Sequence, residues 1–382
     1  MAYQTLKQEI ITYSKSIGID KIGFAAANEF SAMKSRLKQQ QDDGYQSGFE
    51  KGTIEERTEP VLHLADAESI IAIAVAYPSR MKKPPKSSKG SRRGNFCRAS
   101  WGMDYHHVLN EKLDKLSTFI ASKVPGFQCR SMVDTGELSD RAVAERAGIG
   151  FSGKNTMIIT PEFGSYVYLG EMITNIPFPP DEPVDDGCGE CTKCLDACPT
   201  GALVEPGRLN AQNCIAFVTQ TKGFLPDKYR EIMGNQLYGF DTCQVVCPKN
   251  KQVDTHLHPE LEPEPDLVKP ELIPLLSISN REFKERFGSM AGSWRGKKPI
   301  QRNAIIALAH YKDEAAIPEL IRLMKVDPRP VIRGTAAWAI GKIGTKEGFK
   351  AIRQAQTNEE DEDVLNEMDK GLTYELKQVE KS

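Results

Sequence analysis

The first part of the chain alternates between helical and strand patterns of apolar residues. Apolar positions three and four apart predict a helix over residues 6–17, followed by a strand over 19–27 and a second helix over 29–41. The continuous apolar run 69–77, SIIAIAVAY, is closed by Pro78. Such a run is typical of a strand buried in an α/β sheet. The pattern therefore favours an α/β fold for this part of the chain.

The same alternation continues to residue 174. Further elements are expected at 104–123 (helix), 128–133 (strand), 139–147 (helix), 157–160 (strand) and 165–174 (strand). Asp134 directly follows one of these strands, where α/β folds place their chemistry. A lone Asp at the start of a helix serves equally well as a helix cap. Both interpretations of Asp134 stay open at this point.

Two Pro-rich linkers, residues 177–187 and 259–270, separate a middle segment from a helical C-terminal part. There, the stretch beginning at Arg302 (RNAIIALA) can be aligned with the stretch beginning at Arg333 (RGTAAWAI), about one helical hairpin further on. We interpret these as two HEAT-type hairpins, with residues 364–376 as a degenerate third unit that caps them. Such repeats present an extended binding surface.

Cysteine spacing indicates the chemistry of the middle segment. The run CGECTKCLDACP, which begins at Cys188, has the C-x2-C-x2-C-x3-C-P spacing of bacterial ferredoxins. The fourth cysteine of such a run ligates a second cluster, so further cysteines are required downstream. The first [4Fe–4S] cluster is expected to take Cys188, Cys191, Cys194 and Cys247. The second is expected to take Cys198, Cys214, Cys243 and one more ligand.

That last ligand is not a cysteine. Phe240 stands three residues before Cys243, where a ferredoxin half usually carries Cys. The neighbouring Asp241 offers a carboxylate; otherwise the iron is open or bound to water. Structural zinc is the alternative for the whole segment. Zinc sites usually pair two C-x2-C units at longer separation, so the spacing favours iron–sulfur clusters.

Composition narrows the class of protein. The chain has 382 residues, of which 40% are hydrophobic and 27% charged, with a formal net charge of -2. These values are ordinary for a globular protein of two or three domains, and any nucleic-acid surface must be local. Nine cysteines, with seven in the cluster segment, favour a reducing compartment. Without a signal peptide or a long apolar run, we expect a cytoplasmic protein that does not span a membrane.

Two basic stretches are candidate phosphate contacts. Residues 80–98 carry basic charges and no acid, in either a solvated loop or a phosphate-binding loop. Residues 281–302 are also basic and include Trp294. Two clusters behind an α/β domain, with a basic repeat domain after them, indicate a reductase that acts on a nucleic acid.

Four segments resemble the epoxyqueuosine reductases, a family of tRNA-modification enzymes related in their core to reductive dehalogenases. They are VDTGELSDRAVAERAGIGFSGKNTMII, SYVYLGEMITN, CGECTKCLDACPTGAL and YGFDTCQVVCPKN. The similarity extends over essentially the whole chain. It implies an α/β cobalamin-binding catalytic domain at 1–177, a ferredoxin-like module with two [4Fe–4S] clusters at 178–258, and a HEAT-like tRNA-binding domain at 271–382.

The resemblance also implies a reaction, the reduction of epoxyqueuosine to queuosine in the anticodon loop of tRNA. This is the last step of queuosine biosynthesis, with electrons passing through both clusters to cobalamin. Asp134 would donate a proton, and we expect desolvation to raise its pKa. A low-potential donor such as ferredoxin or flavodoxin is the expected electron source, and the protein is expected to be a monomer.

The resemblance assigns candidate cobalamin contacts, and the basic patches suggest candidate tRNA contacts. Cobalamin contacts are expected at Arg57, Cys97, Asp134, Asn155, Ile158 and Leu169. Cys97 is either a thiol beside the cobalt or an inert buried residue. The chain has no D-x-H-x-x-G motif, so we expect no histidine to replace the cobalamin base. Contacts with the tRNA backbone are expected at Lys222, Arg295, Lys297, Lys298, Arg302 and Arg333.

Three other functions stay open. The chain is alternatively a corrinoid iron–sulfur reductase of a small molecule, whose repeats bind a protein. It is alternatively a ferredoxin-like electron carrier, which would need neither the N-terminal part nor Asp134. The third alternative is an RNA-binding scaffold with structural clusters. Binding of tRNA and of a corrinoid distinguishes these functions.

Overall fold

A computed structural model describes residues 2–379 of the chain. Its helices are α1 (Ala2–Ser16), α2 (Ser31–Asp42), α3 (Tyr105–Ala121), α4 (Asp140–Arg146), α5 (Lys193–Asp196), α6 (Ile215–Val218), α7 (Asp227–Ile232), α8 (Thr242–Val245), α9 (Pro265–Val268), α10 (Leu272–Ser277), α11 (Asn280–Phe287), α12 (Lys297–Tyr311), α13 (Ile317–Val326), α14 (Pro330–Ile343), α15 (Lys346–Gln356) and α16 (Glu362–Val379). Its strands are β1 (Lys21–Ala26), β2 (Ser69–Ala76), β3 (Asn95–Phe96), β4 (Cys129–Met132), β5 (Phe151–Ser152), β6 (Ile158–Ile159), β7 (Val167–Thr174), β8 (Leu203–Glu205), β9 (Arg208–Leu209) and β10 (Gln236–Tyr238).

The chain forms two compact units, each assembled from separate stretches of sequence. The first unit, here called the catalytic unit, contains the residues up to Arg80, Gly102–Cys214 and Asp241–Glu262. The second, here called the repeat unit, contains Met81–Trp101, Ile215–Phe240 and the residues from Pro263 onward. The segment between Cys214 and Cys243 thus belongs to the repeat unit. The positions of the Pro-rich linkers did not indicate this.

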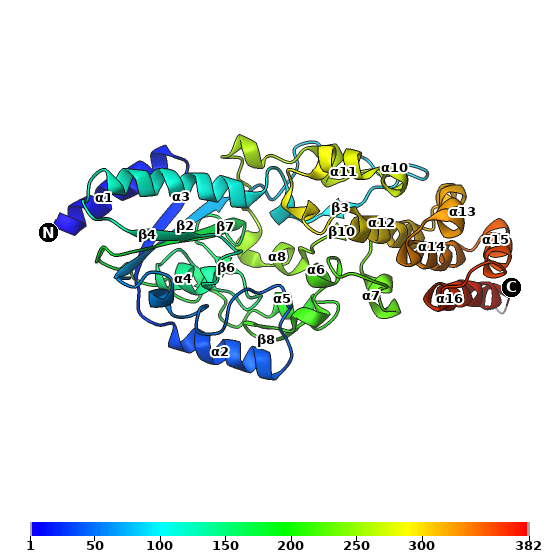
Figure 1. Cartoon of the computed structure of the whole chain (residues 1–382), viewed down its shortest axis with the longest axis horizontal. Coiled ribbons are helices and arrows are strands. Elements are labelled where there is room, and N and C mark those ends of the chain that lie inside the picture. Colours follow the sequence, from blue (N-terminus) through cyan, green and yellow to red (C-terminus); the bar gives the residue numbers. More distant parts are fainter. Residues whose placement is uncertain (1, 380–382) are drawn as a thin grey trace. The chain divides into compact units, whose positions relative to one another are not determined.

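A four-stranded sheet forms the centre of the catalytic unit. Its strand order is β1-β2-β7-β4, and every neighbouring pair is antiparallel. All eight residues of β2 are buried, as the apolar run predicted. Such runs are more typical of parallel sheets. Here the same pattern arises because helices pack on both faces of an antiparallel sheet, with α3 and α4 on opposite sides (Figure 1).

The two faces of the sheet are set by the alternation of side chains along β7. A Cβ at Gly170 would lie 3.1 Å from Leu109 and 3.4 Å from Leu113, so this position faces α3. The next residue, Glu171, points to the other face, where α4 packs. Position 171 is therefore a carboxylic acid in the middle of a sheet that is otherwise apolar at its centre.

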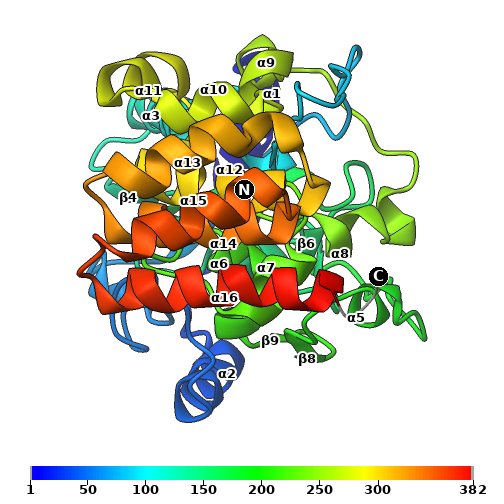
Figure 2. The same cartoon turned by 90° about the vertical axis from the view of Figure 1, so that its right-hand side faces the viewer.

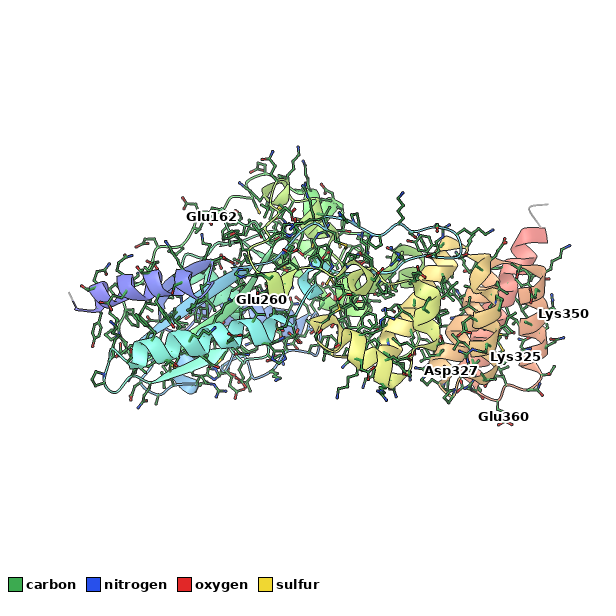
Figure 3. All side chains as sticks on the ribbon, turned by 90° about the horizontal axis from the view of Figure 1, so that it is seen from above. Glu162, Glu260, Lys325, Asp327, Lys350 and Glu360 are labelled. Carbon is green, nitrogen blue, oxygen red and sulfur yellow. The ribbon has the colours of Figure 1, made fainter. Side chains whose placement is uncertain are left out.

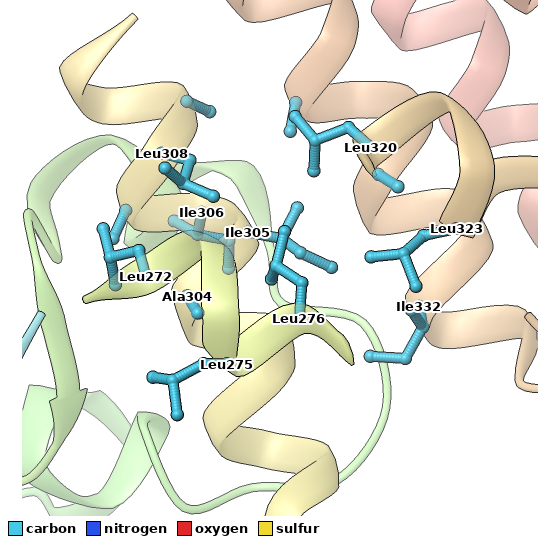
Figure 4. Close-up of a cluster of buried hydrophobic side chains, with 14 of the residues drawn as sticks. Leu272, Leu275, Leu276, Ala304, Ile305, Ile306, Leu308, Leu320, Leu323 and Ile332 are labelled. Carbon is cyan, nitrogen blue, oxygen red and sulfur yellow. The ribbon is translucent and has the colours of Figure 1, made fainter. Parts of the chain in front are cut away.

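Helical hairpins form most of the repeat unit. Helices α12 and α13 follow one another through a short turn, as do α14 and α15, and α14 packs against α12, α13 and α16 (Figure 2). Leucine and isoleucine side chains from α10, α12, α13 and α14 interdigitate in its core (Figure 4). Glycines allow α14 and α16 to approach closely, since a Cβ at Gly341 would lie 2.1 Å from the carbonyl oxygen of Gly371. Two hairpins and a capping helix match the expectation from the sequence.

The helices and strands predicted for the first 174 residues are all present, with ends shifted by a few residues. Within residues 2–379, no helix is both long and apolar enough to cross a membrane.

Candidate active site and cysteine groups

Asp134 lies in the loop that follows β4 and has a left-handed backbone conformation, with φ of 48°. Few residues other than glycine adopt this conformation without strain. It is held by Asp140, whose Oδ2 accepts a hydrogen bond of 2.9 Å from the Asp134 backbone N–H. Asp134 is not a helix cap, because the residue that precedes α4 is Ser139. Of the two interpretations of Asp134, the cap is therefore wrong.

The Asp134 carboxylate contacts two residues at the start of α3. The Tyr105 hydroxyl donates a hydrogen bond of 2.8 Å to Asp134 Oδ2. His106 Nε2 lies 3.5 Å from the same oxygen. On its other side, His106 Nδ1 lies 2.7 Å from Oδ1 of Asp104, which also caps α3 by accepting the His106 backbone N–H. His106 is thus placed between two carboxylates.

This arrangement fixes the position of a proton. The hydrogen bond with Asp104 and the proximity of the Asp134 carboxylate raise the pKa of His106 to about 9, although Nε2 makes no hydrogen bond of normal geometry with a described residue. The same contact with His106 lowers the pKa of Asp134. We expected desolvation to raise the pKa of Asp134; in the chain by itself the side chain is 60% exposed and lies beside the His106 cation, which lowers this pKa. At neutral pH the proton therefore resides on His106, and Asp134 is a carboxylate.

Aromatic stacking holds Tyr105 in place. Its ring lies parallel to that of Tyr168 on β7, with centroids 4.5 Å apart. Tyr168 in turn packs on Tyr77, with centroids 4.4 Å apart. A stacked ring loses little further entropy when its hydroxyl forms a hydrogen bond, so the donor to Asp134 is preorganised.

Behind the Asp134 loop lies a buried pair of acids, Asp140 and Glu171. Glu171 is fully buried, and among the described residues neither of its carboxyl oxygens has a hydrogen bond of normal geometry. Burial, followed by the charge of Asp140, raises the pKa of Glu171 well above its usual range. Burial also raises the pKa of Asp140 to about 6. Burial thus favours the protonated form of Glu171, beside the residue that holds the Asp134 backbone.

Most of the predicted cobalamin contacts belong to the catalytic unit. Ile158 is buried and Leu169 half-buried against one apolar cluster. Asn155 is buried, and its side-chain amide donates to the carbonyl of Cys243 at 3.4 Å. Arg57 is half-buried, which lowers its pKa, and no described residue accepts a hydrogen bond from its guanidinium. Cys97 lies in the repeat unit, where it is buried beside Gly239.

These residues fit a large, flat ligand with amide arms. Leu169 contributes a partly exposed apolar surface beside the Asp134 loop. The half-buried guanidinium of Arg57 has no hydrogen-bond acceptor among residues 2–379. Buried polar groups in native proteins are normally hydrogen-bonded, so unsatisfied ones indicate a partner that the chain itself does not supply. A corrin ring with amide side chains has the required shape and chemistry.

The first group of cysteines surrounds one cavity of about 110 Å³. Its lining includes Cys188, Cys191, Cys194 and Cys247, the four residues assigned by spacing to the first cluster. Lys154 and Asn155, on the loop after β5, lie at the same cavity. The Lys154 backbone N–H donates to Cys188 Sγ at 3.5 Å, a contact that lowers the charge density of a thiolate. Four sulfurs around a cavity suit a cubane cluster.

The second group gathers around Cys243. Burial raises the pKa of the Cys243 thiol to about 12, with further contributions from the charges of Cys214 and Asp241. Asp241 is itself buried, directly before α8. Cys198 contributes to the same shift, and its Sγ accepts the backbone N–H of Ala202 at 3.2 Å. Asp241, Cys198 and Cys214 thus all lie near Cys243, as does Cys194 of the first group.

The predicted tRNA contacts divide into exposed and buried residues. Lys222 and Lys298 are exposed, and Arg295 and Lys297 are half-buried. Arg302 is only 1% exposed, and its guanidinium donates to the carbonyls of Thr221 and Gly223 at 2.7 and 2.9 Å. The assignment of Arg302 to the tRNA surface is therefore wrong in this structure, because the side chain has an internal role.

Arg333 is also engaged within the repeat unit. It forms two hydrogen bonds with Glu359, of 2.7 and 2.8 Å, and a third with the carbonyl of Asp327. A phosphate contact by Arg333 would first require the loss of this ion pair.

Sequence reasoning missed Asp104, Tyr105 and His106, although the motif DYH at the start of a helix combines a cap, a phenol and an imidazole.

Family models match three parts of the chain. They are epoxyqueuosine reductase QueG (residues 57–135), the 4Fe-4S double cluster binding domain (187–250) and HEAT repeats (295–368). The epoxyqueuosine reductase of Bacillus anthracis is 65% identical over 97% of this chain and 98% of its own length. That of Bacillus subtilis is 66% identical over 96% of this chain and 95% of its own length.

Solved structures give the same result. A crystal structure of epoxyqueuosine reductase with a tRNA-Tyr epoxyqueuosine-modified tRNA stem loop matches with a TM-score of 0.96 and 65% identity, over 98% of this chain and 100% of that one. The Bacillus subtilis enzyme, solved with its Asp134 catalytic loop swung out of the active site, matches with a TM-score of 0.95 and 64% identity, over 97% of this chain and 99% of that one.

The fold, the cluster-binding segment and the helical repeats together define an iron–sulfur oxidoreductase. The relatives define the family more narrowly, because they are epoxyqueuosine reductases that match nearly the full length of the chain. The chain belongs to the epoxyqueuosine reductase family.

Proposed function

We propose that this chain reduces epoxyqueuosine to queuosine in the anticodon loop of tRNA. The observation that supports it most strongly is 65% identity, over 98% of the chain, to a reductase solved with an epoxyqueuosine-modified tRNA stem loop. The reaction converts an epoxide, two electrons and two protons into an alkene and water. A catalyst therefore needs a source of electrons and a donor of protons at the leaving oxygen.

The proton donor is the Asp134–His106 pair. His106 holds the proton at neutral pH, and Asp134 Oδ2 lies 3.5 Å from His106 Nε2. Asp134 accepts this proton as the carbon–oxygen bond breaks and delivers it to the leaving oxygen, which is general acid catalysis by a shared proton. The second proton of the released water comes from solvent. Asp104 keeps the imidazole oriented through its 2.7 Å contact with Nδ1. The Tyr105 hydroxyl holds the Asp134 carboxylate in position.

Within the catalytic unit, cobalamin would be bound by Arg57, Asn155, Ile158 and Leu169. When bound, cobalamin supplies the electrons that cleave the epoxide. The apolar surface at Leu169 would exclude water from the reacting carbon, and Arg57 would find a hydrogen-bond acceptor among the corrin side chains. The half-buried guanidinium would then no longer lack a partner.

Two [4Fe–4S] clusters would deliver these electrons singly. The first would be held by Cys188, Cys191, Cys194 and Cys247, which share a cavity. The second would be held by Cys198, Cys214, Cys243 and the Asp241 carboxylate. The buried position of Asp241 beside Cys243 supports the carboxylate over a water ligand. A cytoplasmic ferredoxin or flavodoxin would reduce the protein, which would act as a monomer.

The experiment supplies anaerobically reconstituted protein with cobalamin, a low-potential reductant and tRNA that carries epoxyqueuosine. Mass spectrometry of the digested nucleosides should show loss of one oxygen from the modified base, dependent on cobalamin. Asp134→Asn should bind cofactor and clusters but lose most turnover. Glu162→Gln is the matched control, because this exposed carboxylate pairs with Lys21 on the surface (Figure 3).

Two outcomes would count against the proposal. Full turnover by Asp134→Asn would remove Asp134 from the proton path. An unchanged nucleoside, with both clusters and corrinoid present in the protein, would favour a corrinoid reductase of a small molecule.

A further inference from the structure

An exposed tryptophan lies in the repeat unit at the junction before α12. Trp294 is 53% exposed, whereas the other two tryptophans of the chain, Trp101 and Trp338, are 4% and 2% exposed. Exposing an indole forgoes the free energy of burying one of the largest apolar side chains. Isolated exposed apolar residues are common. The inference therefore depends on how this indole is held and what surrounds it.

The indole is held by a side-chain amide. Trp294 Nε1–H donates to Gln220 Oε1 at 2.9 Å, and the amide nitrogen of Gln220 donates to the Ala216 carbonyl at 2.9 Å. The next residue, Arg295, donates from Nε to the Gln220 carbonyl at 3.1 Å. Its guanidinium carbon lies 4.8 Å from the centroid of the Trp294 ring. An exposed ring that is fixed by hydrogen bonds is preorganised for contact with a partner.

The surroundings carry positive charge. Lys222 follows Gln220 by two residues, and Lys297 and Lys298 follow Arg295 at the start of α12. Lys222 and Lys298 are exposed, while the Lys297 ammonium donates to the Ile278 carbonyl at 2.9 Å. The acids that act on Lys297 are Glu282 and Asp327. A fixed aromatic ring among cations matches the combination that proteins use for single-stranded nucleic acids.

We infer that Trp294, backed by Arg295, is a stacking site for an unpaired base of the RNA substrate. Bases in single-stranded loops can be splayed out and stacked on an aromatic face, whereas paired bases cannot. The lysines would contact the neighbouring phosphates. This inference rests on the proposed function, because it takes tRNA as the partner. It adds a contact that carries no charge, which the basic residues alone do not provide.

The test separates stacking from charge through the dependence of binding on salt. Binding of a fluorescently labelled tRNA stem-loop is measured for each variant at several salt concentrations. Trp294→Ala should weaken binding about 10- to 100-fold without changing the slope of log K against log salt. Lys298→Ala should reduce that slope by about 0.7 to 0.9, because one phosphate contact is lost. Trp294→Phe should keep most of the affinity, since a phenyl ring also stacks.

Val326→Ala is the matched control, because Val326 is a 64% exposed apolar residue on another helix of the same unit. It should bind the stem-loop as the wild type does. Gln220→Leu tests the preorganisation, because it removes the acceptor of the Trp294 N–H. It should weaken binding less than Trp294→Ala does. Thermal unfolding of each variant shows whether the fold is retained.

Intrinsic fluorescence gives an independent measure. The exposed Trp294 should be quenched by a stacked base, whereas the buried Trp101 and Trp338 should not respond. Quenching by RNA should therefore disappear in Trp294→Phe.

If the wild type binds no RNA, the proposed function fails and the inference fails with it. If the wild type binds RNA and Trp294→Ala binds equally well, only the stacking inference is overturned. Normal RNA binding by Trp294→Ala, together with loss of reduction by the electron-donor protein, would assign the indole to a protein interface instead.

Discussion

Two buried arginines in the core of the repeat unit differ from the buried acids next to Asp134 in the catalytic unit. In the repeat unit, Arg302 is 1% exposed and has carbonyl acceptors for its guanidinium, and Arg230 and Glu367 form a buried ion pair. In the catalytic unit, Glu171 is fully buried and no described residue gives either of its oxygens a normal hydrogen bond. Asp140 also has one unsatisfied oxygen.

This difference separates structural charges from functional ones. A buried charge with all its hydrogen bonds made stabilises one arrangement of the chain, and losing one partner is costly. A buried acid without partners changes its protonation instead, and perturbed pKa values of this kind cluster at functional sites. The unsatisfied acids lie directly behind Asp134, whose backbone Asp140 holds. The repeat unit uses its buried charges to join segments that are distant in sequence.

The largest expected effect is on the proton at His106. His106→Gln should lower turnover about 10²- to 10⁴-fold at neutral pH, because the glutamine carries no proton to pass on. The pKa of His106 is raised to about 9, so wild-type turnover should be full below that pH and fall as the pH rises through it. The variant should lack this alkaline limb. Rates are measured across pH by nucleoside mass spectrometry.

His107→Gln is the matched control for this prediction. His107 is the next residue on α3 and is exposed, so the change should leave both the rate and its pH dependence intact. Equal losses in the two variants would show a general disturbance of α3 and would remove His106 from the proton path.

The next effect should appear in stability and not in chemistry. Glu367→Gln leaves the Arg230 guanidinium buried beside an uncharged partner, and should lower the free energy of unfolding by about 3–5 kcal/mol. The Arg230→Met/Glu367→Leu double variant should recover much of this loss, because neither charge then remains. Denaturant unfolding measures the stability, and turnover is compared per folded molecule. A loss of turnover in folded Glu367→Gln would break the contrast between the two units.

A smaller effect is expected on the pH dependence of stability, and it comes from the buried acid Glu171. The pKa of Glu171 is raised in the folded state, so the folded protein binds more protons than the unfolded chain above the usual Glu pKa. This contribution to stability is present at low pH and is lost as the pH rises through the folded-state pKa. Glu171→Gln should therefore unfold at a temperature that falls less with increasing pH than that of the wild type.

Asp140→Asn helps to assign the pH dependence of the melting temperature to Asp140 or to Glu171. Burial raises the pKa of Asp140 to about 6, so its contribution should change between about pH 4 and 6 and leave the alkaline range to Glu171. Parallel melting curves of wild type and Glu171→Gln from pH 6 to 9 would show that Glu171 is charged in the folded protein.

The sequence predicted those features that depend on local spacing. Periodicity located the helices and strands of the catalytic unit, and the crossed cysteine rule grouped Cys247 with Cys188, as the shared cavity supports. It did not predict what depends on long-range packing. The sequence did not show that Asp134 lies beside His106, which lowers the pKa of Asp134. This contact depends on how α3 packs across the sheet. Arg302 looked like a surface cation, because its carbonyl partners lie about eighty residues earlier in the chain.

The smallest effect is expected in the basic loop, residues 80–98. Its charges suggested a phosphate contact, but in the repeat unit Arg93 pairs with Asp266 and Glu271, and Lys89 lies 3.5 Å from Glu314. Lys89 and Glu314 are 70% and 62% exposed, and such pairs contribute only about 0–1 kcal/mol. Lys89→Ala should therefore leave the melting temperature, and the affinity for a tRNA stem-loop, within error of the wild type.

Lys298→Ala, measured in the same titration, supplies the contrast. Removing this exposed lysine near Trp294 in the sequence should lower the salt dependence of binding, whereas removing Lys89 should not. A reduced salt dependence in Lys89→Ala would show that this loop contacts phosphates in spite of its internal acids, and would extend the RNA surface beyond the start of α12.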